Sequence, residues 1–195
     1  MRFTKECRDR VAATSAEDEG FTLIELLVVL LIIGILLAIA IPTYLSIVKG
    51  ANTTASQSNL TEALTGSDIY YTQNQSYNAL TTGASGVSDI SQLDIGLSFV
   101  SAASPGVHAV SVFVTDAGSA VVLVVYSPAD KTCWGILDLK AIATGAIPGN
   151  FAGTSAVGTY YFAYNPSTAT VSSCNASTAT ASAADISVNG FPKLP

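Results

Sequence analysis

The stretch GFTLIELLVV, residues 20–29, opens a long apolar run near the N-terminus. Between residues 26 and 41 no side chain is polar, and extending the run back to Phe21 gives 21 residues interrupted only by Thr22 and Glu25. About 20 predominantly apolar residues are needed for a helix to cross a bilayer. The sequence therefore predicts one membrane-spanning helix over residues 21–42.

Beyond Pro42 the apolar pattern becomes weaker and amphipathic. Its apolar positions recur near the i, i+3, i+4, i+7 spacing of one helix face. We therefore expect a single long helix from Phe21 to about Tyr71, apolar all round at first and then packing one stripe onto a globular domain. The expected stripe comprises Tyr44, Ile47, Val48, Ala51, Ala55, Leu60, Ala63, Leu64 and Tyr71.

After residue 106 the pattern changes to short β-branched runs, which are typical of strands. The runs cover residues 107–115, 120–127, 133–139 and 159–164, with turn formers at 116–118 and 128–130 between the first three. The first three runs have the spacing of an antiparallel meander, and the helical stripe can cover one face of that sheet. The predicted fold class is α+β, a long N-terminal helix packed on a small antiparallel β-sheet domain.

Four segments follow from these patterns. They are a polar leader (1–20), the apolar helix (21–42), its amphipathic continuation (43–75) and a β-rich head domain (76–195). The part of the head at residues 167–184 is mostly Ser, Thr and Ala, so apart from Cys174 we expect irregular or mobile structure there.

The charges set the topology and exclude one class of partner. The net charge is −6 and the pI is near 4.5, so no direct nucleic-acid site is expected, because a basic stripe is needed to replace phosphate counterions. Four of the eight basic residues precede the apolar run. By the positive-inside tendency, the N-terminus stays cytoplasmic, the head lies outside, and membrane lipid surrounds the helix before any assembly.

Three cysteines divide between leader and head. Cys7 lies in the leader, which leaves Cys133 and Cys174 as the pair in the extracytoplasmic part. An oxidising compartment favours a disulfide between them. Two free buried thiols remain the alternative.

Glu25 needs an explanation, because a carboxylate within a membrane helix costs about 2.5 to 3.5 kcal/mol even on mild insertion scales. If the chain is cut after Gly20, a new α-amino group appears at Phe21, one turn from Glu25. A neighbouring subunit could present that amine to Glu25, and the ion pair would fix the axial offset between subunits. The alternative is a carboxylate at the helix start, close to the membrane surface and attracted by the helix dipole.

The residues from Gly20 to Tyr44, including Gly34 and Pro42, resemble the type IV pilin family and its class III signal peptide. The resemblance implies cleavage of the Gly20–Phe21 bond by a membrane-embedded prepilin peptidase, N-methylation of Phe21 and a role for Glu25 in assembly. It also implies a helical filament of identical subunits, built by pilus assembly machinery in the cytoplasmic membrane. Gly34 and Pro42 weaken a helix, and the segment between them is expected to melt in the filament.

A Sec-type signal peptide cleaved after Ala40 is the competing interpretation. It is disfavoured because the helical pattern continues through the supposed cleavage site.

No enzyme, cofactor or metal site is expected. The single histidine, His108, falls in a predicted strand without a nucleophile in a recognisable motif. Trp134 is expected to pack in the core against the Cys133–Cys174 bridge. The scattered acids lack the spacing of a calcium loop and are interpreted as solvated turn residues; they are Asp89, Asp94, Asp116, Asp130, Asp138 and Asp185.

Three functions remain open at this stage. The first is the major pilin of a surface filament that serves adhesion, motility or DNA uptake. The second is a pseudopilin of a type II secretion system, which shares the same N-terminus. The third is a membrane-tethered or secreted binding domain. The lack of a recognisable calcium loop favours the first over the second.

Overall fold

The computed structural model describes residues 20–80, 96–114, 118–141, 151, 154, 156–165, 168–180 and 186–193. The chain divides into two compact units, Met1–Leu45 and Ser46–Pro195. The leader before Gly20, Cys7 included, lies outside the described residues. So do the expected turn at Asp116 and the acids Asp89, Asp94 and Asp185.

Helix α2 (Leu23–Asn74) is continuous through Gly34 and Pro42, so the predicted long helix is confirmed. Pro42 has no N–H to donate to the preceding turn, and the Thr43 hydroxyl donates to the Ile39 carbonyl at 3.1 Å beside it. The helix ends where Gln75 takes a positive φ of 55° and its N–H bonds the Tyr71 carbonyl at 2.7 Å.

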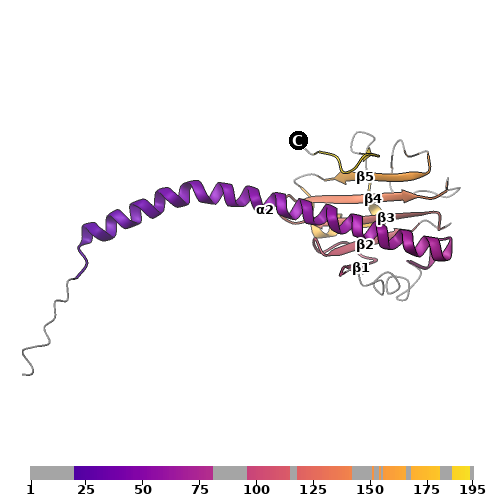
Figure 1. Cartoon of the computed structure of the whole chain (residues 1–195), viewed down its shortest axis with the longest axis horizontal. Coiled ribbons are helices and arrows are strands. Elements are labelled where there is room, and N and C mark those ends of the chain that lie inside the picture. Colours follow the sequence, from indigo (N-terminus) through magenta and orange to yellow (C-terminus); the bar gives the residue numbers. More distant parts are fainter. Residues whose placement is uncertain are drawn as a thin grey trace, which may run out of the picture. The chain divides into compact units, whose positions relative to one another are not determined.

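The head contains a six-stranded sheet in which spatial order follows chain order (Figure 1). Strands β1 and β2 are parallel and the remaining neighbours are antiparallel. The α+β fold and the meander are therefore confirmed. The strands are β1 (Ser98–Val100), β2 (Ala109–Val114), β3 (Ala120–Ser127), β4 (Thr132–Leu139), β5 (Gly158–Tyr164) and β6 (Ile186–Ser187).

Two short strands were not predicted, and one residue was placed wrongly. Strands β1 and β6 have three and two residues, too short for an alternating pattern to be visible in the sequence. His108 is not in a strand: it is an exposed turn residue before β2, and its carbonyl accepts from the Ser98 amide at 3.0 Å.

Helix α2 covers one face of the sheet within the second unit (Figure 1). Its side chains Leu60, Ala63, Leu64 and Tyr70 pack with alternate residues of β3 and β4. The buried helix face also includes the small residues Ser56, Gly66 and Ser67, which let the helix backbone approach the sheet closely. The expected stripe was therefore right at Leu60, Ala63 and Leu64 but wrong at Tyr44 and Ile47, which are 67% and 64% exposed.

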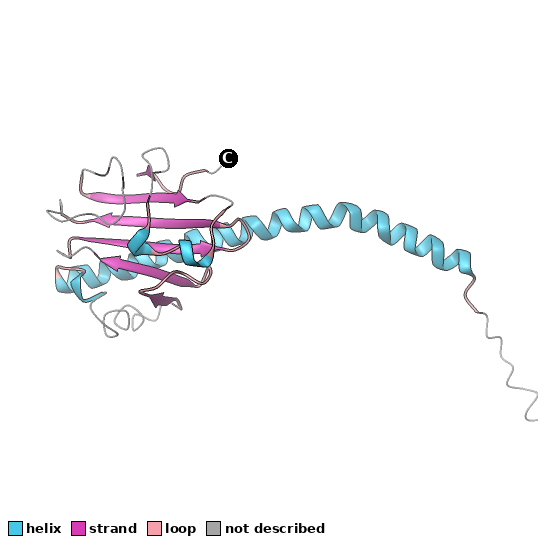
Figure 2. Ribbon diagram, turned by 180° about the vertical axis from the view of Figure 1, so that it is seen from behind, coloured by secondary structure: helices cyan, strands magenta, loops and turns pink. Residues whose placement is uncertain are grey.

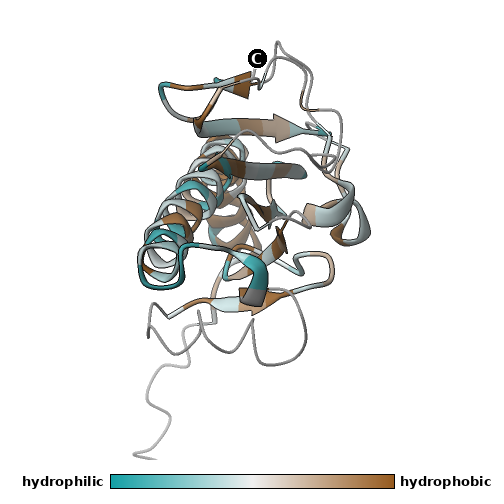
Figure 3. Cartoon of the chain, turned by 90° about the vertical axis from the view of Figure 1, so that its right-hand side faces the viewer, coloured by the Kyte–Doolittle hydropathy of each residue, from teal (hydrophilic) through white to brown (hydrophobic). Residues whose placement is uncertain are grey.

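The other face of the sheet is covered by the chain at residues 168–180 (Figures 2 and 3). This cover segment contains the short turns η2 (Val171–Ser173) and η3 (Ala176–Thr178). The expected irregular structure is therefore interrupted by two single-turn 3-10 helices, and the segment is packed against the sheet. Its buried side chains, Ala169, Cys174, Ala176 and Ala179, lie in one cluster with Val122, Val124, Leu137 and Phe162 of the sheet.

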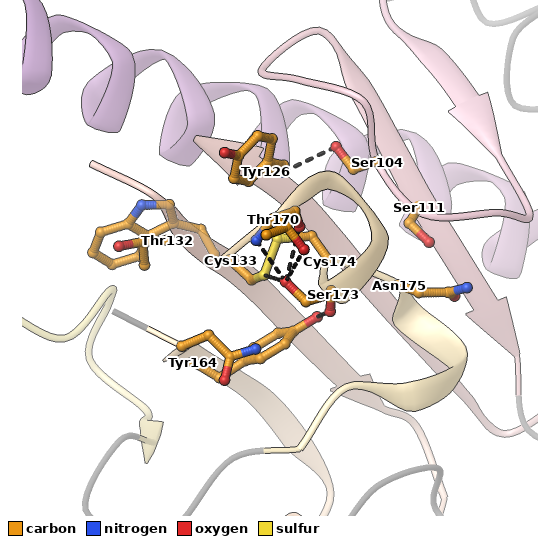
Figure 4. Close-up of a disulfide and its surroundings, with 12 residues drawn as sticks. Ser104, Ser111, Tyr126, Thr132, Cys133, Tyr164, Thr170, Ser173, Cys174 and Asn175 are labelled. Carbon is orange, nitrogen blue, oxygen red and sulfur yellow. Dashed lines mark hydrogen bonds between the residues drawn. A yellow bond between two sulfur atoms is a disulfide. The ribbon is translucent and has the colours of Figure 1, made fainter. Parts of the chain in front are cut away.

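A disulfide between Cys133 and Cys174 ties the cover segment to β4 (Figure 4). The two Cα atoms are 5.3 Å apart and both residues are fully buried. Hydrogen bonds hold the segment on either side of the bridge: Ser104 donates its amide to the Cys174 carbonyl at 2.8 Å, and Ala176 donates its amide to Ser111 Oγ at 2.9 Å.

Trp134 is a core residue, but it does not pack against the disulfide. Side chains alternate across a strand, so Cys133 faces the cover segment while Trp134 faces the helix side. There the indole lies edge-on to Phe191 at 5.8 Å between ring centroids. The predicted contact between Trp134 and the disulfide is therefore wrong, because Trp134 is one residue away from Cys133 and lies on the opposite face of β4.

We predict that Cys174→Ser lowers the free energy of unfolding of the head by up to about 4 kcal/mol, because the closed loop is lost, and that the cover segment becomes the first site of proteolysis. Urea denaturation and limited proteolysis of the full chain measure both effects. Cys7→Ser is the matched control and leaves both unchanged. Equal stability of the Cys174 variant and the parent would show that the cover is held by its packing and hydrogen bonds alone.

Candidate functional site

The residues Gly20, Phe21 and Thr22 precede the first turn of α2 and are exposed. The Phe21 side chain is 88% exposed. The Gly20–Phe21 peptide bond thus lies outside the helix, and an exposed, non-helical bond is open to proteolysis without prior unwinding.

Thr22 and Glu25 form a capping box at the start of α2. The Glu25 carboxylate accepts from the Thr22 amide at 2.9 Å and from the Thr22 hydroxyl at 2.7 Å. In return, the Glu25 amide donates to Thr22 Oγ1 at 3.3 Å. The pattern T-x-x-E before an apolar run is a sequence signal for this motif, and our sequence interpretation did not use it.

The capping box gives Glu25 a local partner while the leader is attached. An acidic side chain in the first turn also interacts favourably with the helix dipole. The amine that would make an ion pair exists only after the Gly20–Phe21 bond is cut. The two roles considered for Glu25, at the helix start and between subunits, therefore do not exclude each other, because the second requires an amine that the first does not.

The apolar run that follows is exposed throughout. The large side chains of residues 26–37 are each 45% exposed or more, and within the described part of the chain α2 is the one helix long and apolar enough to cross a membrane. A Cβ added at Gly34 would meet nothing within 4 Å. Packing inside the chain therefore does not require a glycine there.

A second polar cluster lies in the head, around Asp138 of β4. Asp138 is 1% exposed, so its interpretation as a solvated turn residue was wrong. Its carboxylate accepts from Tyr77 Oη at 2.5 Å and Thr159 Oγ1 at 2.9 Å. Lys140 Nζ lies 3.1 Å from Asp138 Oδ2 and 2.7 Å from Asp68 Oδ1 on α2.

This cluster joins Asp68 near the end of α2, Tyr77 beyond the end of that helix, Asp138 and Lys140 at the end of β4, and Thr159 of β5. Burial, followed by the hydrogen bond and charge of Asp138, raises the pKa of the Tyr77 phenol far above its usual value. Burial alone would lower the pKa of Lys140, but hydrogen bonds and attraction to Asp68 and Asp138 outweigh it and raise that pKa. Asp138 falls on the same side of β4 as Trp134 and Ile136, so strand alternation could have marked it as an acid facing the core.

Asp130 lies in a turn, as predicted, but it is less solvated than expected. It is half-buried in the β3–β4 turn, and its Oδ2 accepts from Thr53 Oγ1 at 2.8 Å and Trp134 Nε1 at 3.2 Å. Among the described residues no three His, Cys, Asp or Glu side chains are grouped to hold a metal ion.

Comparison with known proteins concerns the N-terminal part of the chain. The family model described as the prokaryotic N-terminal methylation motif matches residues 18–41. The type IV wide pilus major component PilA4 of Thermus thermophilus is 44% identical over 61 residues, which are 31% of this chain and 47% of that protein. The type IV major pilin protein PilA of Myxococcus xanthus is 35% identical over 69 residues, 35% of this chain and 31% of that protein.

The chain thus carries the methylation motif, and about a third of it is similar to type IV pilins. The aligned part spans less than half the length of either relative. No solved structure matches the chain.

We predict that Tyr77→Phe and Lys140→Met each lower the free energy of unfolding by about 2 kcal/mol, because each leaves the buried Asp138 carboxylate short of a partner. Chemical denaturation measures the effect. Lys131→Met, which removes an exposed lysine, is the matched control and changes stability by no more than about 0.5 kcal/mol.

The same cluster sets a pH dependence. Both raised pKa values stabilise the folded state below pH about 10, where Tyr and Lys titrate in the unfolded chain, and that contribution is lost as pH rises further. The Tyr77→Phe variant should lose stability less steeply above that pH than the parent. If the free energy of unfolding fell equally steeply with pH in the variant and the parent, the Tyr77 phenol would have no role in this pH dependence.

Proposed function

We propose that this chain is the precursor of a type IV pilin, a structural subunit of a surface filament rather than an enzyme. The leader is removed between Gly20 and Phe21 by a prepilin peptidase, and Phe21 is N-methylated. The subunit then waits in the cytoplasmic membrane, anchored by the apolar half of α2 with its head outside, and is built into a helical filament by pilus assembly machinery.

One observation carries this proposal: a non-helical, exposed Gly–Phe bond stands directly before an apolar helix that has a carboxylate at Glu25. The methylation motif covers this same segment. The relatives that match it are a pilus component and a major pilin by name, which favours a pilus over a secretion pseudopilus. Adhesion, motility and DNA uptake are the functions that we propose for the assembled fibre.

Assembly changes the partner of Glu25. In the single subunit the carboxylate is held by Thr22. In the filament we propose that it pairs with the Phe21 amine of a neighbouring subunit, which neutralises both charges in an apolar bundle and sets the axial offset. We propose that the segment between Gly34 and Pro42 melts there, because a glycine and a helix-interior proline weaken the helix and its large side chains are exposed in the described part of the chain.

The proposed disulfide chemistry agrees with an external head. A bridge between Cys133 and Cys174 forms in an oxidising compartment, which is where the positive-inside tendency puts residues after the apolar run.

The first prediction of this proposal concerns processing. The mature N-terminus is Phe21 carrying a methyl group, because the exposed junction is cut and the apolar helix stays on the product. Intact-mass measurement and N-terminal sequencing of cell-associated protein test this. A start at Ile41 would instead identify a Sec-type signal peptide and remove the filament proposal.

The second prediction concerns Glu25. Glu25→Ala leaves membrane insertion intact, because it removes a carboxylate that costs about 2.5 to 3.5 kcal/mol in lipid, but it abolishes or greatly reduces filaments. Thr22→Ala is the matched control: it breaks the capping box, worth about 1 kcal/mol, and spares the carboxylate.

Membrane fractionation and electron microscopy of sheared filaments measure the two outcomes in each strain. Glu25→Gln keeps the shape without the charge and should behave like Glu25→Ala. Loss of filaments in Thr22→Ala to the same extent as in Glu25→Ala would refute the inter-subunit ion pair and assign Glu25 to helix capping alone.

A further inference from the structure

Two of the four lysines that follow the leader meet at the end of the sheet where β4 begins. Lys49 lies on α2, and its carbonyl accepts from Thr53 Oγ1 at 3.1 Å. The same hydroxyl donates to Asp130 Oδ2 at 2.8 Å. Lys131 is the next residue after Asp130, in the β3–β4 turn, so the Thr53–Asp130 hydrogen bond places Lys49, one helical turn before Thr53, and Lys131 at the same end of the head.

The C-terminal segment brings a third lysine to this end. Trp134 Nε1 donates to Asp130 at 3.2 Å, and the Trp134 ring lies edge-on to Phe191. Phe191 is two residues before Lys193, a reach of about 7 Å. Lys49, Lys131 and Lys193 are all exposed, and we call them the basic end of the head.

These three charges are not fully neutralised by the described residues around them. Among the described residues the acid at this end is Asp130, which accepts from Thr53 and Trp134 through Oδ2 and makes no ion pair with the three lysines; its single charge offsets one of theirs and leaves the end positive. The ion pairs in the described part of the chain both belong to the fourth lysine, Lys140. A concentrated positive charge therefore stands on a chain whose net charge is −6.

The chain itself keeps the basic end close to the membrane. Lys49 follows the last residue of the apolar run, Ile41, by eight positions on α2, which is about 12 Å at 1.5 Å per residue. The headgroup layer on each side of the hydrocarbon core is about 5 to 8 Å thick, and helix side chains lean toward the helix N-terminus, which is the membrane side of Lys49. The length of helix between them thus lets Lys49 reach the headgroups.

We propose that Lys49, Lys131 and Lys193 bind anionic lipid headgroups of the outer leaflet while the subunit waits in the membrane. This inference rests on the anchored precursor proposed above. Lysine suits such a surface, because it is a point charge that needs no fixed geometry at each phosphate. Each lysine near an anionic membrane strengthens attachment by about fivefold. The three lysines together keep the head bound to the membrane surface until contacts with the growing filament replace the lipid contacts.

The single tryptophan supplies the measurement, since Trp134 lies at the basic end. The full chain is reconstituted into phosphatidylcholine vesicles with or without phosphatidylglycerol, each containing a trace of dansyl-labelled lipid as energy acceptor. We expect stronger energy transfer from Trp134 with phosphatidylglycerol. At about 1 M salt, where the screening length is about 3 Å, transfer should fall to the level in phosphatidylcholine alone.

Variants assign the effect to the three lysines. The triple variant Lys49→Gln, Lys131→Gln, Lys193→Gln should lose the response to phosphatidylglycerol, and each single change should weaken head attachment by about fivefold. The triple Lys→Arg variant keeps the charge and the response. Glu62→Gln alters an exposed charge on the same helix and should leave the response unchanged.

The outcomes separate this inference from the anchor. Flotation of the chain with the vesicles, but with equal energy transfer in both lipids or in the triple Gln variant, overturns lipid binding and leaves the anchored precursor standing. Transfer that rises with protein density rather than with phosphatidylglycerol assigns the lysines to a second copy of the chain and also overturns it. Failure of the chain to float with vesicles removes the anchor, and this inference with it.

Discussion

The structure depends on one constraint: within the described part of the chain, nothing covers the apolar side chains of the first half of α2. Apolar surface left in water is unfavourable by about 25 cal/mol for each Å², so this half must lie in lipid or against other protein. Lipid tails are as apolar as leucine, and apolar side chains alone therefore discriminate weakly between the two. Polar groups on the helix must therefore determine whether this half lies in lipid or against other protein.

The second half of α2, unlike the first, packs against the sheet of the same chain. It covers one face of the sheet and the segment at residues 168–180 covers the other, so β3 and β4 are buried on both sides. The two covers are fixed by different chemistry. The helix is held by close approach through small residues and by the polar cluster at Asp138, whereas the cover segment is held by a covalent bridge and small alanine side chains. A head with so little charge relies on these few specific links.

Sequence patterns predicted the elements that repeat over many residues. The long helix and four strands were visible because apolar periodicity accumulates with length. The patterns failed at positions where the packing depends on the identity or orientation of a single residue. Ser56, Gly66 and Ser67 carry no apolar signal, although burial of the helix depends on their small size. Asp138 was assigned to a turn on residue type, although its position in β4 turns it toward the core, and Trp134 was placed on the wrong face by one residue. At the N-terminal site the sequence interpretation considered the Gly20–Phe21 junction and Glu25, but it missed the Thr22 contact because capping was not considered.

The capping box explains how one carboxylate can serve both environments of the helix. A buried carboxylate without partners would strongly oppose insertion of the helix into the membrane. If the single subunit already held Glu25 in a buried ion pair, however, the carboxylate would gain no further stabilisation from a neighbouring subunit on assembly. Thr22 supplies an intermediate: two hydrogen bonds to Glu25 within one turn, with no charge neutralised. The carboxylate is thereby satisfied well enough to remain at the membrane surface, and its uncompensated charge still favours a cationic partner. In the pathway proposed above, leader removal creates the amine at Phe21, so capping precedes cleavage and cleavage precedes pairing between subunits.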